Sequence, residues 1–243
     1  MRRAGWQRFV AYGCAVLLCQ ALAGCGSTEG PPTPTKEDKG QVQAAASIPA
    51  ASIPADAPLV IAFGDSLYAG YGLGPKQGLA PQLQAALAAD GVQARVQNSG
   101  VSGDTTAAGR ARLTFVLDRA AKKPALVLLG LGGNDMLRGI KPSETRANLD
   151  AMLAELQRRD IPVLLTGLIA APNMGPDYAA AFNPIYPELA RKYDTSLYPF
   201  ALDGVTAVPG MLLDDNIHPN AKGVAVMAAA LAPLVAEELP EAP

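Results

Sequence analysis

Short apolar runs that alternate with helix-like segments are the feature that most constrains the fold of this 243-residue chain. Runs that are apolar at almost every position are typical of strands buried on both faces of a parallel sheet. The strands expected on this basis are residues 59–63, 92–98, 125–131, 162–168 and 196–200. Because strands that alternate with helices form parallel sheets covered on both faces, we predict an α/β domain.

The segments between these strands have the apolar spacing of helices. We expect helices at residues 79–89, 105–121, 143–159, 178–193 and 221–239. Ser143 is the expected N-cap of the third helix. Pro184 and Pro187 should interrupt the fourth helix, and Pro233 should bend the last one, because proline cannot donate the helical hydrogen bond.

The chain contains one histidine, His218, in the segment Asp215-Asn216-Ile217-His218-Pro219. An isolated histidine is most often a surface or capping residue. Here, however, a serine follows the first apolar run in Gly64-Asp65-Ser66-Leu67, and a serine hydroxyl needs an imidazole base to act as a nucleophile. Asp215 can orient the ring through Nδ1, with Asp214 as the adjacent alternative. The pattern indicates a serine hydrolase with Ser66, His218 and Asp215 at its centre.

Two glycine-rich loops follow other predicted strands and could stabilise an oxyanion. They are Ser99-Gly100-Val101-Ser102-Gly103-Asp104 and Gly132-Gly133-Asn134-Asp135. Glycine lets backbone amides approach a ligand closely, and an asparagine amide is a suitable donor. Taken singly, each loop is ordinary turn chemistry. Because ligands bind beyond the carboxyl ends of parallel strands, we expect both loops to lie on the same rim as Ser66.

In this order, the four blocks around Ser66, Gly103, Asn134 and His218 resemble those of the SGNH, or GDSL-type, hydrolases. The likeness runs from about Leu59 to the last helix and is greatest to the bacterial branch of multifunctional thioesterase I, lysophospholipase and arylesterase. It is carried by Gly64-Asp65-Ser66-Leu67 with Ala69-Gly70-Tyr71, by Val101-Ser102-Gly103-Asp104-Thr105, by Gly132-Gly133-Asn134-Asp135 with Leu137-Arg138-Gly139, and by residues 215–220. The resemblance implies a three-layer α/β/α sandwich with a five-stranded parallel sheet in flavodoxin-like order.

The resemblance also implies the roles of the site residues. Ser66 would be the nucleophile, with His218 and Asp215 completing the triad. The oxyanion would be bound by the backbone N–H groups of Ser66 and Gly103 and by the side chain of Asn134.

Further positions follow from the same resemblance. Residues 136–142 would form a mobile substrate loop, in which Met136, Leu137 and Ile140 offer apolar surface to acyl chains. Asp65 matches the family pattern and would brace the turn. Asn216 departs from it, because that branch often has glycine there.

The N-terminal segment has the pattern of a bacterial lipoprotein signal. Arg2, Arg3 and Arg8 form a basic region, and residues 9–22 are apolar but too short for a comfortable membrane span. The sequence Leu22-Ala23-Gly24-Cys25 resembles a lipobox, which predicts cleavage of residues 1–24 and acylation of Cys25. An ordinary signal peptide with an incidental cysteine is the alternative.

Residues 25–57 would then be a lipidated tether, followed by the hydrolase domain at residues 58–243. The tether is rich in Pro, Ala, Ser and Thr and buries too little apolar surface to fold. We expect a protein exported and lipid-anchored in the bacterial cell envelope, with Gly26 favouring the periplasmic face of the outer membrane. Cleavage would leave 17 basic and 22 acidic residues, a net charge of −5 that disfavours nucleic acid as a partner.

We expect a monomer that needs no cofactor. With one histidine, and with Cys25 modified and Cys14 and Cys19 removed, a catalytic zinc site cannot be assembled in the usual way. Ser66 is not in a Gly-x-Ser-x-Gly elbow, and residues 70–74 lack the rest of a nucleotide-binding motif.

The predicted function is hydrolysis of carboxylic esters through an acyl-serine intermediate. By the resemblance, the substrates would be aryl or short-to-medium acyl esters, lysophospholipids and thioesters, with the membrane reached through Cys25. One alternative is an O-acetylesterase or acetyltransferase acting on envelope polysaccharide. Another is a lipid-anchored binding or assembly factor with a vestigial site, which the intact Ser66, Asp215 and His218 oppose.

Overall fold

The computed structural model describes residues 53–240. The predicted signal segment, Cys25 and most of the predicted tether lie outside this range, so the domain boundaries at residues 24 and 57 stay predictions. None of the helices formed by residues 53–240 combines the length and the apolar character that a membrane-spanning helix needs.

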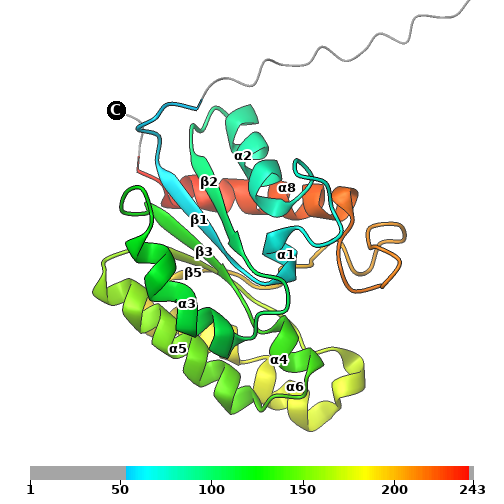
Figure 1. Cartoon of the computed structure of the whole chain (residues 1–243). Coiled ribbons are helices and arrows are strands. Elements are labelled where there is room, and N and C mark those ends of the chain that lie inside the picture. The colour runs from blue at the N-terminus through cyan, green and yellow to red at the C-terminus, as the bar shows by residue number, and fades with distance from the viewer. Residues whose placement is uncertain (1–52, 241–243) are drawn as a thin grey trace, which may run out of the picture. The chain divides into compact units, whose positions relative to one another are not determined.

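The core of the domain is a five-stranded sheet in which every pairing is parallel (Figure 1). Its strands are β1 (Leu59–Gly64), β2 (Arg95–Gly100), β3 (Leu126–Gly130), β4 (Val163–Thr166) and β5 (Ser196–Tyr198), in the order β2-β1-β3-β4-β5. This is the flavodoxin-like order, in which ligands bind where the strand order reverses. The predicted fold class is confirmed.

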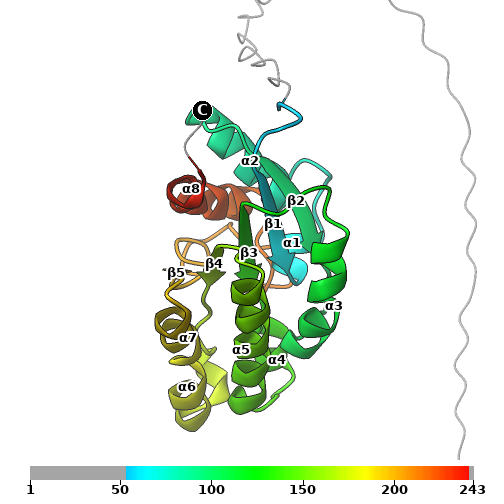
Figure 2. The same ribbon diagram turned by 90° about the vertical axis from the view of Figure 1, so that its left-hand side faces the viewer.

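Helices cover both faces of the sheet (Figure 1 and Figure 2). They are α1 (Ser66–Ala69), α2 (Leu79–Ala89), α3 (Thr106–Asp118), α4 (Gly133–Leu137), α5 (Pro142–Arg158), α6 (Pro176–Phe182), α7 (Ile185–Tyr193) and α8 (Ala221–Glu238), with a 3₁₀ turn, η1 (Pro172–Met174). Side chains alternate along β1: Ile61 and Phe63 pack with α3, α5 and α7, whereas Val60 and Ala62 pack with α2 and α8. Burial on both faces explains why the central strands are apolar at consecutive positions.

The second strand begins and ends later than predicted. Residues 92–98 were expected, whereas β2 is Arg95–Gly100. Val92 N–H bonds the carbonyl of Leu87 and so belongs to the turn that ends α2. β2 pairs only with β1, starting at Leu59 and Arg95, and this pairing sets its limits.

Helix ends also differ from the predictions. The predicted helix at residues 178–193 is two helices, α6 and α7, which separate at Asn183 and Pro184, while Pro187 lies within α7. Ser143 is not an N-cap, because α5 already begins at Pro142, a residue suited to the first helical position. α8 continues through Pro233 to Glu238.

The end of the predicted tether is attached to the domain. Ala57 N–H bonds the carbonyl of Pro54 at 3.2 Å. The ammonium group of Lys122, just after α3, donates to the carbonyls of Asp56, at 2.8 Å, and of Ala57. Ala57 itself is buried, so ordered structure starts before residue 58.

Candidate active site

Ser66 stands at the first position of the one-turn helix α1, directly beyond the carboxyl end of β1. The carboxylate of Asp65 caps this helix by accepting a hydrogen bond from Leu67 N at 3.1 Å. Tyr68 is buried beneath it and bonds the hydroxyl of Thr166 at 2.7 Å. A side chain at Gly64 or Gly130, at the ends of β1 and β3, would collide with the Tyr68 ring. These contacts fix the height at which Ser66 stands above the sheet.

The structure brings Ser66, His218 and Asp215 into one hydrogen-bonded chain. The hydroxyl of Ser66 and Nε2 of His218 share a hydrogen bond of 2.9 Å, and Nδ1 of His218 and Oδ2 of Asp215 share one of 2.6 Å. Oδ1 of Asp215 accepts from the backbone N–H groups of Ile217, at 2.9 Å, and His218, at 3.0 Å. These bonds, led by the one from His218 N–H, lower the pKa of Asp215 to about 2. The carboxylate is therefore ionised throughout the neutral range.

The loop that carries His218 has a tightly specified backbone. Asn216 has φ of 57°, in the left-handed region that asparagine tolerates better than most residues, which accounts for asparagine where the resembled branch often has glycine. Leu213 N–H bonds the carbonyl of His218 at 2.8 Å, which closes the loop. Among the described residues, the carboxylate within hydrogen-bonding distance of Nδ1 is that of Asp215, whereas Asp214 offers its backbone carbonyl to Asn216.

The ring of Tyr71 lies against the imidazole of His218. The ring centroids are 4.4 Å apart with an interplanar angle of 35°, and Tyr71 is 51% exposed. Tyr71 belongs to the motif that follows Ser66, but it is not among the predicted site residues. A tyrosine five residues after a predicted nucleophile carries no signal of this contact, because the contact depends on a loop far away in the sequence.

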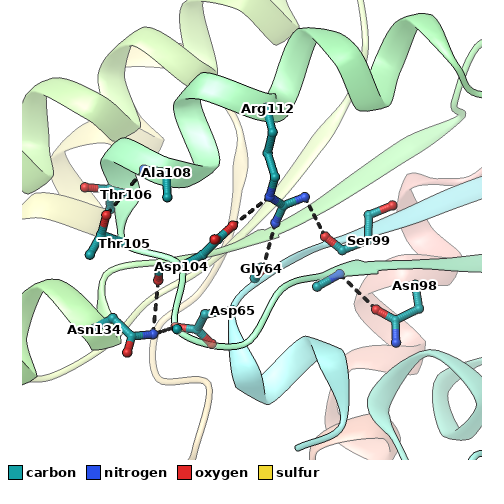
Figure 3. A network of polar contacts seen from close by, with 12 residues as sticks. Gly64, Asp65, Asn98, Ser99, Asp104, Thr105, Thr106, Ala108, Arg112 and Asn134 are labelled. Carbon is teal, nitrogen blue, oxygen red and sulfur yellow. Dashed lines mark hydrogen bonds and ion pairs between the residues drawn. The ribbon is translucent and has the colours of Figure 1, made fainter.

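The two candidate oxyanion loops meet beside Asp65, the residue before Ser66 (Figure 3). Nδ2 of Asn134 donates to the backbone carbonyl of Asp104 at 3.0 Å and lies 3.4 Å from Oδ2 of Asp65. Gly103 has φ of 87°, which requires glycine, and its carbonyl accepts from Nη2 of Arg138 at 2.8 Å. The loop after β2 and the helix α4 after β3 are therefore joined at the predicted rim.

The residue after Asn134, Asp135, is buried and fixes the backbone of α4 through its side chain. The Asp135 carboxylate accepts hydrogen bonds from Thr106 N at 2.8 Å, from the Thr106 hydroxyl, and from the Thr145 hydroxyl at 3.1 Å. These donors belong to α3 and α5, so α4 is fixed to both helices. Buried polar groups are normally hydrogen-bonded, and three donors satisfy the Asp135 carboxylate here.

The predicted substrate loop, residues 136–142, is only partly a loop. Met136 and Leu137 end α4, and Pro142 begins α5. The backbone amide of Ala171 donates to Sδ of Met136 at 3.2 Å, and the Tyr178 hydroxyl donates to the Ile140 carbonyl at 3.0 Å. Leu137 points outward and is 57% exposed. Helix formation after Gly132 shortens the loop because Asp135 anchors α4, an interaction that no local pattern indicates.

Asp65 is a buried carboxyl group next to Ser66, only 3% exposed. Burial raises its pKa from 3.8 to about 6, against the lowering effects of the Leu67 amide, the charge of His218 and the Asn134 amide, while the nearby Asp104 also raises it. At neutral pH, the folded protein must therefore keep a negative charge in a poorly hydrated place.

Asp65→Asn is expected to change how stability depends on pH. A raised pKa in the folded state stabilises the wild type fully below pH 3.8, and this contribution is lost as the pH rises through about 6. The contribution is about 3 kcal/mol, since each pH unit between the two pKa values is worth about 1.4 kcal/mol. Urea unfolding at pH 4 and pH 7 should show the wild type losing about 2 kcal/mol relative to the variant, whose amide keeps the cap, because a small part of the contribution is already lost at pH 4. Equal differences at both pH values would contradict this prediction.

Fold and site together define a serine hydrolase built on a three-layer α/β/α sandwich. Comparison with known families identifies it further: the model of the GDSL-like lipase/acylhydrolase family matches residues 62–226. The chain therefore belongs to this family and is a serine esterase, as the sequence motifs predicted.

Characterised relatives agree with this assignment. Over 165 residues the chain is 44% identical to the esterase TesA of Pseudomonas aeruginosa, covering 68% of this chain and 81% of the relative. It is 38% identical over 168 residues to the thioesterase 1/protease 1/lysophospholipase L1 of Escherichia coli, covering 68% and 77%. The crystal structure of AlinE4, an SGNH-hydrolase family esterase, is similar with a TM-score of 0.65 and 49% identity, covering 76% of this chain and 98% of that one.

Proposed function

We propose that Ser66, His218 and Asp215 are the catalytic triad of this esterase. The observation that carries the proposal is the continuous chain of hydrogen bonds from the Ser66 hydroxyl through both ring nitrogens of His218 to the Asp215 carboxylate. In this series of hydrogen bonds, Nε2 would be the acceptor that a general base requires, and Nδ1 would carry a proton and donate it in a hydrogen bond to the Asp215 carboxylate. We further propose that the oxyanion is bound by the backbone N–H groups of Ser66 and Gly103 and by the side-chain amide of Asn134.

The reaction would proceed in two displacements. Ser66 Oγ bonds to the ester carbonyl carbon while its proton passes to Nε2 of His218, and the carbonyl oxygen becomes an oxyanion. Collapse of this intermediate breaks the bond to the alcohol or thiol, which leaves with the proton from His218. Water then gives a proton to His218 as its oxygen bonds to the acyl carbon. Collapse of this second intermediate breaks the bond between Ser66 Oγ and the acyl carbon, returns the proton from His218 to Oγ and releases the carboxylic acid.

Electrostatics supports these roles. The ionised Asp215 stabilises the imidazolium that forms in each displacement. Nδ2 of Asn134 donates one hydrogen to the Asp104 carbonyl at 3.0 Å and the other, over a longer 3.4 Å, to Oδ2 of Asp65. The hydrogen on the longer bond is the one that would turn from Asp65 to the oxyanion, while the bond to the Asp104 carbonyl keeps the amide in place.

We propose that the substrates are aryl esters, short-to-medium acyl esters, lysophospholipids and thioesters. Support comes from the names of the relatives, an esterase and a thioesterase/lysophospholipase. It also comes from an apolar rim, which comprises Tyr71, Val101, Leu137, Ile169 and Ile217. These are five of the seven exposed large hydrophobic side chains among the described residues, and they lie on segments that follow strand ends or precede His218. Such a rim suits an acyl chain.

The test is a screen of p-nitrophenyl esters from acetyl to lauroyl, together with a lysophospholipid and an acyl thioester. Ser66→Ala serves as the blank, and fluorophosphonate labelling reports the reactive serine. Hydrolysis and labelling by the wild type, both absent in the variant, are the expected results. Activity on acetyl groups alone would favour the polysaccharide O-acetylesterase alternative. Equal turnover in the two proteins would refute the role of Ser66.

We propose that the protein is exported and anchored in the cell envelope through Cys25. The lipobox-like sequence before this cysteine supports the proposal, and the cysteine lies outside the described residues. Metabolic labelling with palmitate should mark the wild type in the membrane fraction and leave Cys25→Ala unlabelled. Label that persists in the variant would contradict the lipobox interpretation.

A further inference from the structure

Arg112, on α3, binds the segments that carry the nucleophile and the oxyanion loop (Figure 3). Each of its three guanidinium nitrogens makes one hydrogen bond. Nε donates to the Asp104 carboxylate at 2.6 Å, Nη1 to the Ser99 carbonyl at 2.8 Å, and Nη2 to the Gly64 carbonyl at 2.9 Å. The guanidinium also lies over the Phe63 ring, 3.9 Å from its centroid. One side chain thus contacts β1, β2 and the loop after β2.

These contacts are close to the reacting groups in the chain. Gly64 is the last residue of β1, two positions before Ser66, and Ser99 lies near the end of β2, four positions before Gly103. Asp104 follows Gly103 and offers its own carbonyl to Nδ2 of Asn134. The guanidinium therefore contacts the segments of Ser66 and Gly103 directly, through Gly64 and Asp104. It is linked to Asn134 through the Asp104 carbonyl.

The hydrogen bonds of Arg112 are largely shielded from water and depend on the shape of its guanidinium group. The side chains of Arg112 and Asp104 are 21% and 12% exposed, so water competes weakly for their hydrogen bonds. A guanidinium is planar and presents its donors at fixed angles, which a lysine ammonium cannot reproduce. Rotation of the Asp104 peptide would move both Gly103 and the carbonyl that orients Asn134.

From this geometry we infer that Arg112 is a positioning residue for oxyanion stabilisation, acting through Asp104 and the ends of β1 and β2. The inference rests on the proposed function, because it assumes the oxyanion donors named above. Arg112 would then stabilise the transition state, in which the oxyanion forms. It would have little effect on binding of the ester, which has no oxyanion.

Arg112→Gln tests the inference, with Arg110→Gln as the matched control. Arg110 lies on the same helix, has the same charge and is exposed, and its guanidinium bonds Asn148 on α5. We expect kcat of Arg112→Gln to fall by about 10- to 100-fold, with KM changed by less than about twofold, because a displaced donor acts only in the transition state. Arg112→Lys should recover part of the loss, and Arg110→Gln should match the wild type.

A trifluoromethyl ketone with the acyl chain of the ester gives a second measurement. It adds to the serine hydroxyl and places an oxyanion between the same donors, so its affinity should fall together with kcat. Circular dichroism and thermal melting establish that each variant is folded at the assay temperature. If Arg112→Gln does not fold, Asp104→Asn replaces it, since this variant weakens the ion pair and keeps the carbonyl that binds Asn134.

The outcomes separate the inference from the proposed function. Full kcat in the folded variant, a loss confined to KM, or an unchanged affinity for the ketone would each overturn the role of Arg112. Because the wild type is assayed beside each variant, absence of ester hydrolysis in the wild type would instead refute the proposed function.

Discussion

His218→Ala is expected to lower kcat for ester hydrolysis by about 10⁵- to 10⁶-fold, the loss typical of removing the base from a serine triad. Without the imidazole, the Ser66 hydroxyl loses the acceptor that lies 2.9 Å away and keeps its proton at neutral pH. His218 is the only histidine in the chain, so no other imidazole can replace it. What remains should come from substrate binding and the oxyanion donors.

The measurement is single-turnover and steady-state hydrolysis of a p-nitrophenyl ester, with fluorophosphonate labelling of Ser66 as a second readout. The fold should persist, because the His218 ring contacts Tyr71 at the surface rather than the core. Added imidazole should restore part of the activity by occupying the vacated space. Retention of more than about one per cent of wild-type kcat would exclude His218 as the general base.

The elements that could be predicted from sequence are those whose pattern is local. β1, β3 and β4 are buried on both faces, and their apolar runs reveal this directly. Ser66, Asp215 and His218 could be predicted as a group because a serine nucleophile needs an imidazole base and a carboxylate that orients it, and the loops of Gly103 and Asn134 could be predicted because glycine-rich turns after strands can offer oxyanion donors. The structure brings Ser66, His218 and Asp215 into hydrogen-bonding contact and joins the two loops through Asn134.

The features that could not be predicted depend on contacts between distant segments. α1 and α4 are too short for a helical period, and α4 exists because Asp135 bonds Thr106 and Thr145 on two other helices. Arg112 reads as an ordinary helix-surface charge, yet two of its partners lie 13 and 48 residues away in the chain. Neither composition nor spacing encodes such pairs, so they appear only in the folded structure.

β2 illustrates the same limit at a strand. Its residues are partly exposed, so alternation gives a weak signal and the predicted strand begins three residues early. The strand instead ends where Gly100 meets α1: a side chain there would lie 2.3 Å from Ala69 N. Asn98 reinforces this junction by accepting from Gly100 N at 2.8 Å. The position of the loop that carries Gly103 is thus set by packing against α1, the helix that carries Ser66.

Asp215→Asn is expected to lower kcat by about 10⁴-fold while leaving the fold intact, the effect known for the equivalent change in a serine protease triad. In the wild type, Oδ1 accepts from two backbone N–H groups and Oδ2 accepts from Nδ1. An asparagine that keeps its oxygen on the backbone donors must turn its NH₂ toward Nδ1. That contact favours the tautomer protonated at Nε2, which cannot take the proton of Ser66. If the asparagine amide turned the other way, its NH₂ group would face the backbone N–H groups of Ile217 and His218. Donors would then face donors, which is unfavourable.

Asp214→Asn is the matched control for this prediction, since it removes the same charge from the adjacent position. Its kcat should stay within about twofold of the wild type, because long-range effects of one exposed charge are small. Equal losses in the two variants would mean that negative charge on the loop, rather than the bond to Nδ1, supports the base. A larger loss in Asp214→Asn would assign the orienting role to Asp214. A loss confined to Asp215→Asn, with normal thermal unfolding, would establish that the tautomer of His218 is fixed by this carboxylate.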